Sequence, residues 1–192
     1  MKRLAFLVSG SGTNMANLIQ RIKAGELRAD AVLVISNKPD VKALDRAKEL
    51  GVPATVISHK DHATREAFDG ALAKCIDSHR IDCIVLAGFM RVLTPDFVRK
   101  YYGRLINIHP ALLPAFPGAH AIKDAWDAKV KETGVTVHFI DSGVDTGPII
   151  LQRKVPMLPG DTLEALETRI HAVEYEIYPE ALKLVLSGKS KA

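Results

Sequence analysis

Residues 4–15 read LAFLVSGSGTNM, an apolar run followed by a turn with two glycines and the start of an amphipathic segment. From Met15 to Ile22 the apolar residues recur at three- and four-residue spacing, which is typical of a helix that buries one face. The run at residues 4–8 is short and continuous, as expected for a strand. The stretch therefore predicts a strand, a glycine loop and a helix in succession.

The same order of elements recurs along the chain. A second helix is expected to end before Gly51, and a third to cover residues 62–79. Because strands that alternate with helices build parallel sheets, we expect an α/β fold of three layers, Rossmann-like, with helices on both faces of a mostly parallel central sheet. The predicted strands are residues 4–8, 31–35, 55–57, 83–87, 105–108, 134–140 and 148–155.

Three of these strands carry further information. Residues 83–87 form a continuous apolar run, which predicts a strand buried on both faces. Residues 134–140 alternate between apolar and polar side chains, which predicts a half-buried strand. The glycine-rich connection after it leads to residues 148–155, and we expect these two strands to pair as a hairpin-like extension.

Helix ends are marked by capping residues. Thr94 is expected to cap a helix whose first residue is Pro95, since proline suits the first turn. Asp161 and Glu164 have the spacing of a capping box, which places the start of a long final helix there. Pro179 is expected to kink or interrupt that helix, because proline removes a backbone donor.

Composition and charge indicate a globular chain. The 192 residues suit one domain, and 47% of them are hydrophobic and 25% charged. The net charge is +4, but Lys and Arg are dispersed among acidic residues, so nucleic-acid binding is not indicated. Cys75 and Cys83 have no metal-binding spacing and are expected to be reduced thiols. The apolar run after Met1 is too short for a signal peptide or a membrane span, so we expect a cytoplasmic protein without a membrane partner.

The glycine loop at residues 9–14 is a candidate phosphate site. Glycines let the main chain approach a ligand closely, and a helix N-terminus presents N–H groups to an anion. The loop lacks the third glycine of a dinucleotide fingerprint and the lysine of a P-loop, and many such segments are only tight turns. A phosphorylated ligand and a plain turn therefore both remain open at this point.

Asn107 and His109 are a candidate catalytic pair. They lie two residues apart at the end of a predicted strand, so they share one face, and the carboxyl ends of parallel strands are where ligands bind. An amide donor beside an imidazole suits a developing oxyanion. A carboxylate such as Asp145 would favour the charged imidazole, so that it could donate a proton. The alternative is structural: a strand-end histidine and a turn-capping asparagine.

Other polar and apolar features are less specific. Residues 111–120 contain two prolines and a glycine, which predicts an ordered loop and a candidate wall of the site. Residues 89–93 could line a pocket for a flat ligand or simply pack in the core. Lys123 is read as a solvated surface charge. His59 and His62 lack the converging carboxylates or thiolates of a metal site, so we expect no metal.

The motifs in this order resemble one known family, the phosphoribosylglycinamide formyltransferases of purine synthesis. The resemblance runs from about residue 4 to residue 179, with Ala111 standing where the family often has serine. It is carried by SGSGTN at residues 9–14, GFMR at 88–91, NIHPALLP at 107–114 and D-x-x-x-DTGPI at 141–149.

The resemblance implies a role for each matching residue. It makes Asn107, His109 and Asp145 the catalytic set, with 10-formyltetrahydrofolate as formyl donor, glycinamide ribonucleotide as acceptor, and no metal. It implies a single domain over residues 1–192, as a monomer or homodimer, with the nucleotide bound by the N-terminal half and the folate by the C-terminal half. The ribonucleotide would be held by Ser11, Gly12, Thr13, Asn14, Met15 and, through a looser motif, Glu174. The folate would contact Arg65, Met90, Arg91, Val92, Leu93, Asn107, Asp141, Val144 and Asp145.

Other functions share parts of this pattern. A formyl-folate hydrolase or a formyltransferase for another amine would use the same Asn-x-His and Asp set. Relatives of those kinds usually carry an extra domain, for which the 192 residues are expected to leave no room. A protein that senses a phosphorylated ligand without catalysis is a further alternative, because a fold does not prove an activity.

Overall fold

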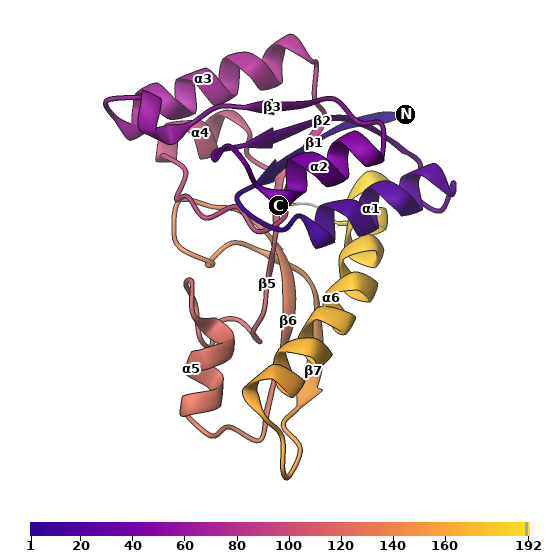
Figure 1. Ribbon diagram of the computed structural model, residues 1–192, viewed down its shortest axis with the longest axis vertical. Coiled ribbons are helices and arrows are strands. Elements are labelled where there is room, and N and C mark those ends of the chain that lie inside the picture. Colours follow the sequence, from indigo (N-terminus) through magenta and orange to yellow (C-terminus); the bar gives the residue numbers. More distant parts are fainter. Residues whose placement is uncertain (191) are drawn as a thin grey trace. The chain divides into compact units, whose positions relative to one another are not determined.

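Strands and helices alternate along most of the computed structural model, which describes residues 1–190 and residue 192 (Figure 1). Its strands form one sheet in the order β3-β2-β1-β4-β5-β6-β7. The pairs β1–β2, β1–β4 and β2–β3 are parallel, and β6–β7 is antiparallel. The expected α/β fold with a mostly parallel sheet is therefore confirmed. By contact density the chain divides into two compact units, Met1–Ile106 and Asn107–Ala192, with the boundary inside β5.

The first unit is a doubly wound strand–helix segment. In Figure 1, α1 and α2 lie on one side of β1 to β3, and α3 lies on the other. Residues 4–8 of β1 are fully buried, since the strand is central and covered by helices. The elements are β1 (Lys2–Val8), α1 (Thr13–Lys23), β2 (Ala29–Ser36), α2 (Lys42–Glu49), β3 (Ala54–Val56), the 3₁₀ helix η1 (His59–Asp61), α3 (Arg65–Ser78), β4 (Cys83–Leu86), α4 (Pro95–Lys100) and the start of β5 (Leu105–His109).

Most of the helix caps and buried strands predicted for this unit are found in the structure. Thr94 is the N-cap of α4, and its hydroxyl accepts a hydrogen bond from the Phe97 amide at 3.3 Å. All four residues of β4 are buried, as predicted. The helix expected over residues 62–79 begins only at Arg65, because Thr64 caps it and a 3₁₀ turn precedes it. Burial raises the pKa of the Cys83 thiol to about 12, so it stays protonated.

The second unit is built on an antiparallel pair of strands and a long helix. The strand β6 (Glu132–Phe139) pairs with β7 (Ile149–Pro156), which confirms the hairpin-like arrangement. The final helix α6 (Leu163–Leu186) packs against both strands (Figure 1). A short helix that the sequence did not indicate, α5 (Ala121–Asp127), follows the loop at residues 111–120.

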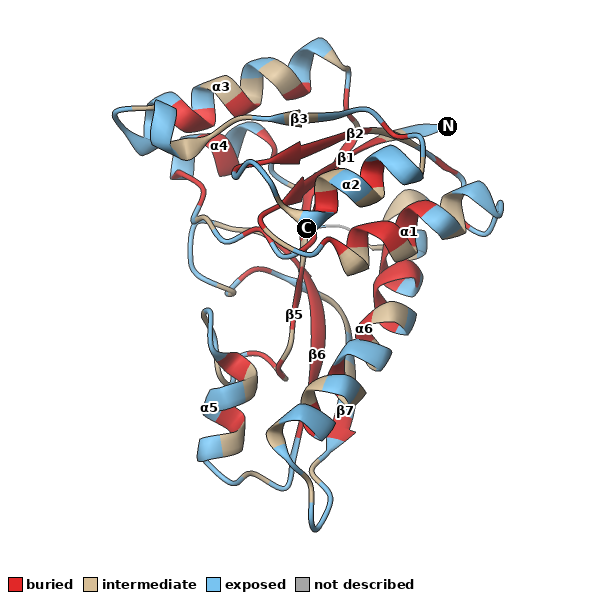
Figure 2. Cartoon of the chain, viewed as in Figure 1, coloured by how far each residue is buried: buried red, intermediate tan, exposed pale blue. Residues whose placement is uncertain are grey.

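The prediction of a half-buried β6 is wrong. Seven of its residues, Thr133 to Phe139, are buried, and the strand is almost uniformly red in Figure 2. The loop at residues 111–120 covers the face that carries Thr136: the Thr136 hydroxyl donates to the Ala111 carbonyl at 2.6 Å and accepts from the Leu113 amide at 3.1 Å. Polar residues on this face are therefore buried but hydrogen-bonded.

The start of α6 differs from the prediction, and the helix continues through Pro179. Its N-cap is Thr162, which accepts from the Ala165 amide at 3.2 Å, rather than Asp161. Asp161 instead accepts from the Leu158 amide and forms two hydrogen bonds with Arg169. Pro179 is buried inside the helix and does not interrupt it, because tertiary packing of the apolar face outweighs the loss of one backbone donor.

Candidate active site

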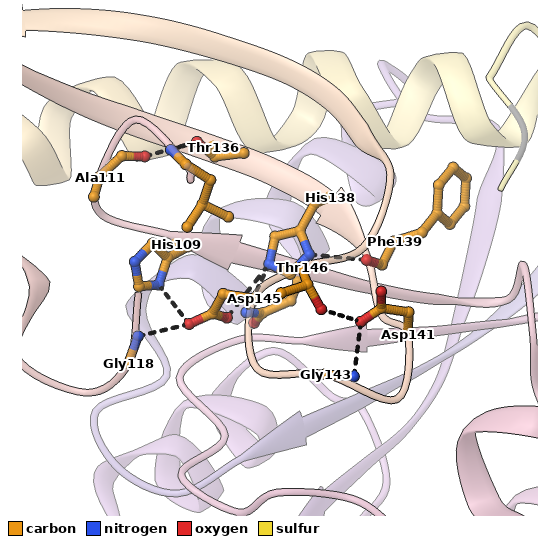
Figure 3. A network of polar contacts seen from close by, with 12 residues as sticks. His109, Ala111, Gly118, Thr136, His138, Phe139, Asp141, Gly143, Asp145 and Thr146 are labelled. Atoms are coloured by element: carbon orange, nitrogen blue, oxygen red, sulfur yellow. Dashed lines mark hydrogen bonds and ion pairs between the residues drawn. The ribbon is translucent and has the colours of Figure 1, made fainter. Parts of the chain in front are cut away.

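His109 is the central residue of the candidate site. It ends β5 and is only 4% exposed. Its Nδ1 lies 3.4 Å from Asp145 Oδ2, and its Nε2 lies 2.7 Å from the Phe116 carbonyl oxygen (Figure 3). Both ring nitrogens therefore face hydrogen-bond acceptors, and an imidazole can donate from both only when it is doubly protonated. The surroundings suit a charged His109.

A second histidine, His138 of β6, contacts the same carboxylate. Its Nε2 lies 3.6 Å from Asp145 Oδ1 and 3.4 Å from Asn107 Nδ2, and its Nδ1 lies 2.8 Å from the Phe139 carbonyl (Figure 3). With Nδ1 donating to that carbonyl, a neutral His138 can accept from the Asn107 amide, whereas a protonated one would donate to Asp145. One signal in the sequence could have pointed to His138, namely a histidine near the end of the strand predicted at residues 134–140, but the prediction did not use it.

Asp145 lies between the two histidines. Burial alone would raise the pKa of this carboxyl, but hydrogen bonds from His138 and from the Gly118 amide, together with the charges of both histidines, lower it below its ordinary value. The Gly118 amide donates to Oδ2 at 2.9 Å. Asp145 is therefore an ionised, half-buried acceptor whose partners come from β5, β6 and the loop at residues 111–120.

The loop between β6 and β7 holds Asp145 in an uncommon backbone conformation. Its φ is +54°, in the left-handed region that aspartate tolerates better than most residues. Asp141 Oδ1 accepts from the Gly143 amide at 3.0 Å and from the Thr146 hydroxyl at 2.7 Å (Figure 3). Val144 at the tip of the loop is 51% exposed. Asn107, His109, Asp141, Val144 and Asp145 thus all belong to the second unit.

The glycine loop belongs to the first unit. Gly12 has a φ of +70° and is the N-cap of α1, and a Cβ added there would lie 2.6 Å from the Ala43 side chain. Glycine is therefore required both by the backbone and by the close approach of α2. Gly12 offers no side-chain acceptor to the N–H groups at the start of α1, and the first turn of α1 has no acidic residue. An external anion can therefore bind at this helix N-terminus.

A buried hydrogen-bond network connects three strand ends of the first unit. The Ser9 hydroxyl after β1 donates to Asn37 Oδ1 after β2 at 2.6 Å, and accepts from the Met90 amide after β4 at 2.8 Å. Asn37 in turn contacts His59 Nδ1 through its side-chain amide at 3.2 Å. His59 is thus part of the network that joins the glycine loop to the segment 90–93.

The proposed folate-contacting residues of the first unit differ in exposure. Met90 and Val92 are 64% and 53% exposed, whereas Leu93 is 7% exposed. Arg91 Nε is buried without a hydrogen-bond partner among the described residues. Arg65 is exposed at the first residue of α3. Within the segment after β4, Met90 and Val92 are therefore accessible, whereas Leu93 is buried.

The proposed ribonucleotide residues fall in both units. Ser11 to Met15 lie in the glycine loop and the first turn of α1, and Glu174 lies on α6. Glu174 is buried, and its carboxylate is 3.0 Å from His171 Nδ1, which raises the pKa of His171. That the glycine loop and Glu174 bind one ligand stays a prediction.

Two searches of the described residues complete the description of the site. Residues 1–190 and 192 contain no group of three or more His, Cys, Asp or Glu side chains placed to hold a metal ion. None of the helices in that same part of the chain is long and apolar enough to cross a membrane.

Comparison with known proteins identifies close relatives. The family described as formyl transferase matches residues 2–182. The chain is 40% identical to phosphoribosylglycinamide formyltransferase of Bacillus subtilis (strain 168), over 97% of this chain and 95% of that protein. It is 52% identical to the trifunctional purine biosynthetic protein adenosine-3 of Drosophila melanogaster, over 97% of this chain, but it spans only 14% of that protein.

Solved structures agree with these matches. Glycinamide ribonucleotide transformylase 1 of Symbiobacterium toebii superposes with a TM-score of 0.95 at 44% identity, covering 98% of this chain and 89% of that one. Phosphoribosylglycinamide formyltransferase of Bacillus halodurans also has a TM-score of 0.95, at 46% identity, covering 98% and 97% of the two chains.

Proposed function

The chain belongs to the formyl transferase family, and from that premise we propose that it transfers the formyl group of 10-formyltetrahydrofolate to the amine of glycinamide ribonucleotide. The products are the N-formyl ribonucleotide and tetrahydrofolate, and the reaction belongs to purine synthesis. We place the enzyme in the cytoplasm, as a single domain over residues 1–192 and as a monomer or homodimer, with small-molecule substrates only.

The observation that carries the proposal is the buried pair of His109 and Asp145, with Asn107 two residues before His109 on the same strand. Formyl transfer passes through a tetrahedral intermediate with a negatively charged oxygen. A protonated imidazole and an amide N–H stabilise that charge when they are aimed at it. The ionised Asp145 places a negative charge 3.4 Å from Nδ1 of the His109 ring.

In the proposed mechanism the substrate amine attacks the formyl carbon, and Asn107 and His109 donate hydrogen bonds to the oxyanion. His109 then delivers a proton to the departing folate nitrogen as the carbon–nitrogen bond breaks. The amine loses its proton through a water that Asp145 orients. Because His109 Nε2 donates to the Phe116 carbonyl in this structure, the substrate oxygen has to replace that carbonyl at Nε2.

We assign the remaining residues to binding. Ser11, Gly12, Thr13, Asn14 and Met15 bind the phosphate of the ribonucleotide, where the N-terminus of α1 favours an anion, and Glu174 binds its other end. We assign contacts with the folate to Arg65, Met90, Arg91, Val92, Leu93, Asn107, Asp141, Val144 and Asp145.

The test is an assay of formyl transfer with 10-formyltetrahydrofolate and glycinamide ribonucleotide, followed by the absorbance of the folate product. A reaction without the amine and the His109→Ala variant are run beside it. We expect amine-dependent turnover that falls at least about 100-fold in the variant, the usual lower size of a general-acid contribution. Folate turnover without the amine would show a hydrolase, and no turnover would point to another amine or to a protein without catalysis.

A further inference from the structure

The loop between β6 and β7 is closed at its base by contacts between its two ends. The Phe139 amide donates to the Pro148 carbonyl at 2.9 Å, which closes the base of the loop. Gly147 lies so close to the end of β6 that an added Cβ would be 1.9 Å from the Phe139 carbonyl oxygen. The loop therefore has little freedom at its base, and its remaining freedom lies between residues 141 and 146.

A second set of contacts closes that middle part. Asp141 Oδ1 accepts two hydrogen bonds, from the Gly143 amide at 3.0 Å and from the Thr146 hydroxyl at 2.7 Å. We call these two bonds the Asp141 clasp. The Thr146 bond spans five residues and joins the start of the loop to the residue directly after Asp145. It consequently restrains the backbone on the C-terminal side of Asp145.

Asp145 depends on this restraint. Its φ of +54° is disfavoured for a residue with a side chain, so the surrounding loop has to hold it there. In this conformation its carboxylate meets His109 from β5, His138 from β6 and the Gly118 amide together. None of those three contacts involves the clasp, so the clasp acts on Asp145 through the backbone alone.

We propose that Thr146 is a positioning residue, whose hydroxyl keeps the Asp141 clasp closed and so holds the Asp145 carboxylate between His109 and His138. The inference rests on the proposed function, because it makes Thr146 part of formyl transfer. Thr146 is exposed and touches neither histidine, so its effect on the reaction is indirect.

The test compares Thr146→Val, which keeps the side-chain shape but removes the hydroxyl, with Thr146→Ser, which keeps the hydroxyl. We expect Thr146→Val to lower kcat about three- to tenfold, the effect of one neutral hydrogen bond, with KM within about twofold. Thr146→Ser restores kcat.

Thr168→Val is the matched control. Thr168 is also exposed, and its hydroxyl makes one hydrogen bond of 2.8 Å to the Glu164 carbonyl on α6. The Thr168→Val substitution therefore removes one comparable hydrogen bond at a position outside the loop. We expect this variant to keep the unaltered kcat.

A readout that does not depend on activity is the NMR chemical shift of the His109 and His138 imidazole resonances at one fixed pH. We expect both resonances to move in Thr146→Val, because the carboxylate beside both rings is displaced, and to return in Thr146→Ser. The proposal is overturned if Thr146→Val matches the unaltered protein in rate and chemical shift, or if Thr146→Ser is as impaired as Thr146→Val. Absence of formyl transfer in the unaltered protein would instead refute the proposed function, and the NMR spectra would still decide the role of Thr146.

Discussion

At the scale of single residues, the candidate site is an ionised carboxylate placed against two imidazoles. The side-chain period of two along a strand puts Asn107 and His109 on one face of β5. His138 on β6 then reaches both Asn107 and Asp145. The lowered pKa of Asp145 follows from these partners, which outweigh the effect of burial. Each histidine thus has a defined hydrogen-bond acceptor at close range.

Removing the charge of Asp145 while keeping its shape tests this arrangement. We expect Asp145→Asn to lower kcat by about 100-fold or more, with KM changed only a few-fold, because the charge acts mainly on the transition state. Asparagine also tolerates a positive φ and can still accept from the Gly118 amide, so the midpoint of thermal unfolding is expected to change little. Steady-state kinetics with both substrates measures the effect. Weakened binding with unchanged kcat would contradict the assignment.

At the scale of elements, the ends of parallel strands supply most of the candidate ligand-binding residues. The loops after β1, β2 and β4 meet at Ser9, whose hydroxyl uses its donor for Asn37 and its acceptor for Met90. Ser9 and Asn37 are 5% and 1% exposed. Loss of the hydroxyl would remove the hydrogen-bond partner of the buried Asn37 Oδ1 and of the part-buried Met90 amide. Leaving a buried polar group such as Asn37 Oδ1 unsatisfied costs about 1–3 kcal/mol.

We therefore expect Ser9→Ala to lower the free energy of unfolding and to raise KM for the folate donor, since the segment 90–93 loses its anchor. Ser36→Ala is the matched control, because the Ser36 hydroxyl is also buried at a strand end but donates to the Lys38 carbonyl at 2.6 Å. Urea unfolding and donor titration measure both variants. An equal rise of KM in Ser9→Ala and Ser36→Ala would show that the change reflects general loss of stability.

At the scale of the whole molecule, the titration of a few groups sets how stability depends on pH. Three carboxyl groups have a pKa below the ordinary value of 3.8. A hydrogen bond from Lys100 lowers the pKa of Asp77, and hydrogen bonds from Arg169 lower that of Asp161. The histidines lower the pKa of Asp145. A carboxyl with a lowered folded-state pKa stabilises the fold above its unfolded pKa, and this contribution is lost as pH falls through the folded pKa.

The contribution of His171 to stability changes with pH in the opposite direction. Its hydrogen bond to Glu174 raises its pKa above 6.5, so its contribution is complete below the unfolded value and is lost as pH rises through the folded value. We expect the free energy of unfolding to be highest between the ordinary pKa values of 3.8 and 6.5 and to decline on both sides. Urea unfolding from pH 3 to 9 measures this. His171→Gln should flatten the decline above pH 6.5, and an unchanged slope in that variant would contradict the prediction.

The sequence by itself determined the order of strands and helices, the α/β class and the catalytic candidates. Continuous apolar runs, helical spacing and local caps are properties of neighbouring residues, so Thr94 and the strand at residues 83–87 could be predicted without the fold. Motifs whose residues lie close in the chain, such as Asn107 and His109, were found for the same reason.

Only the tertiary structure decided which distant groups meet. The burial of β6 on both faces depends on a loop that starts more than twenty residues earlier, and the continuity of α6 through Pro179 depends on packing. The contact of His138 with Asp145 and the positive φ of Asp145 also arise from strand pairing and loop closure. Hydrogen bonds and burial between distant segments carry no periodic signal in the sequence, so these contacts could be identified only in the folded structure.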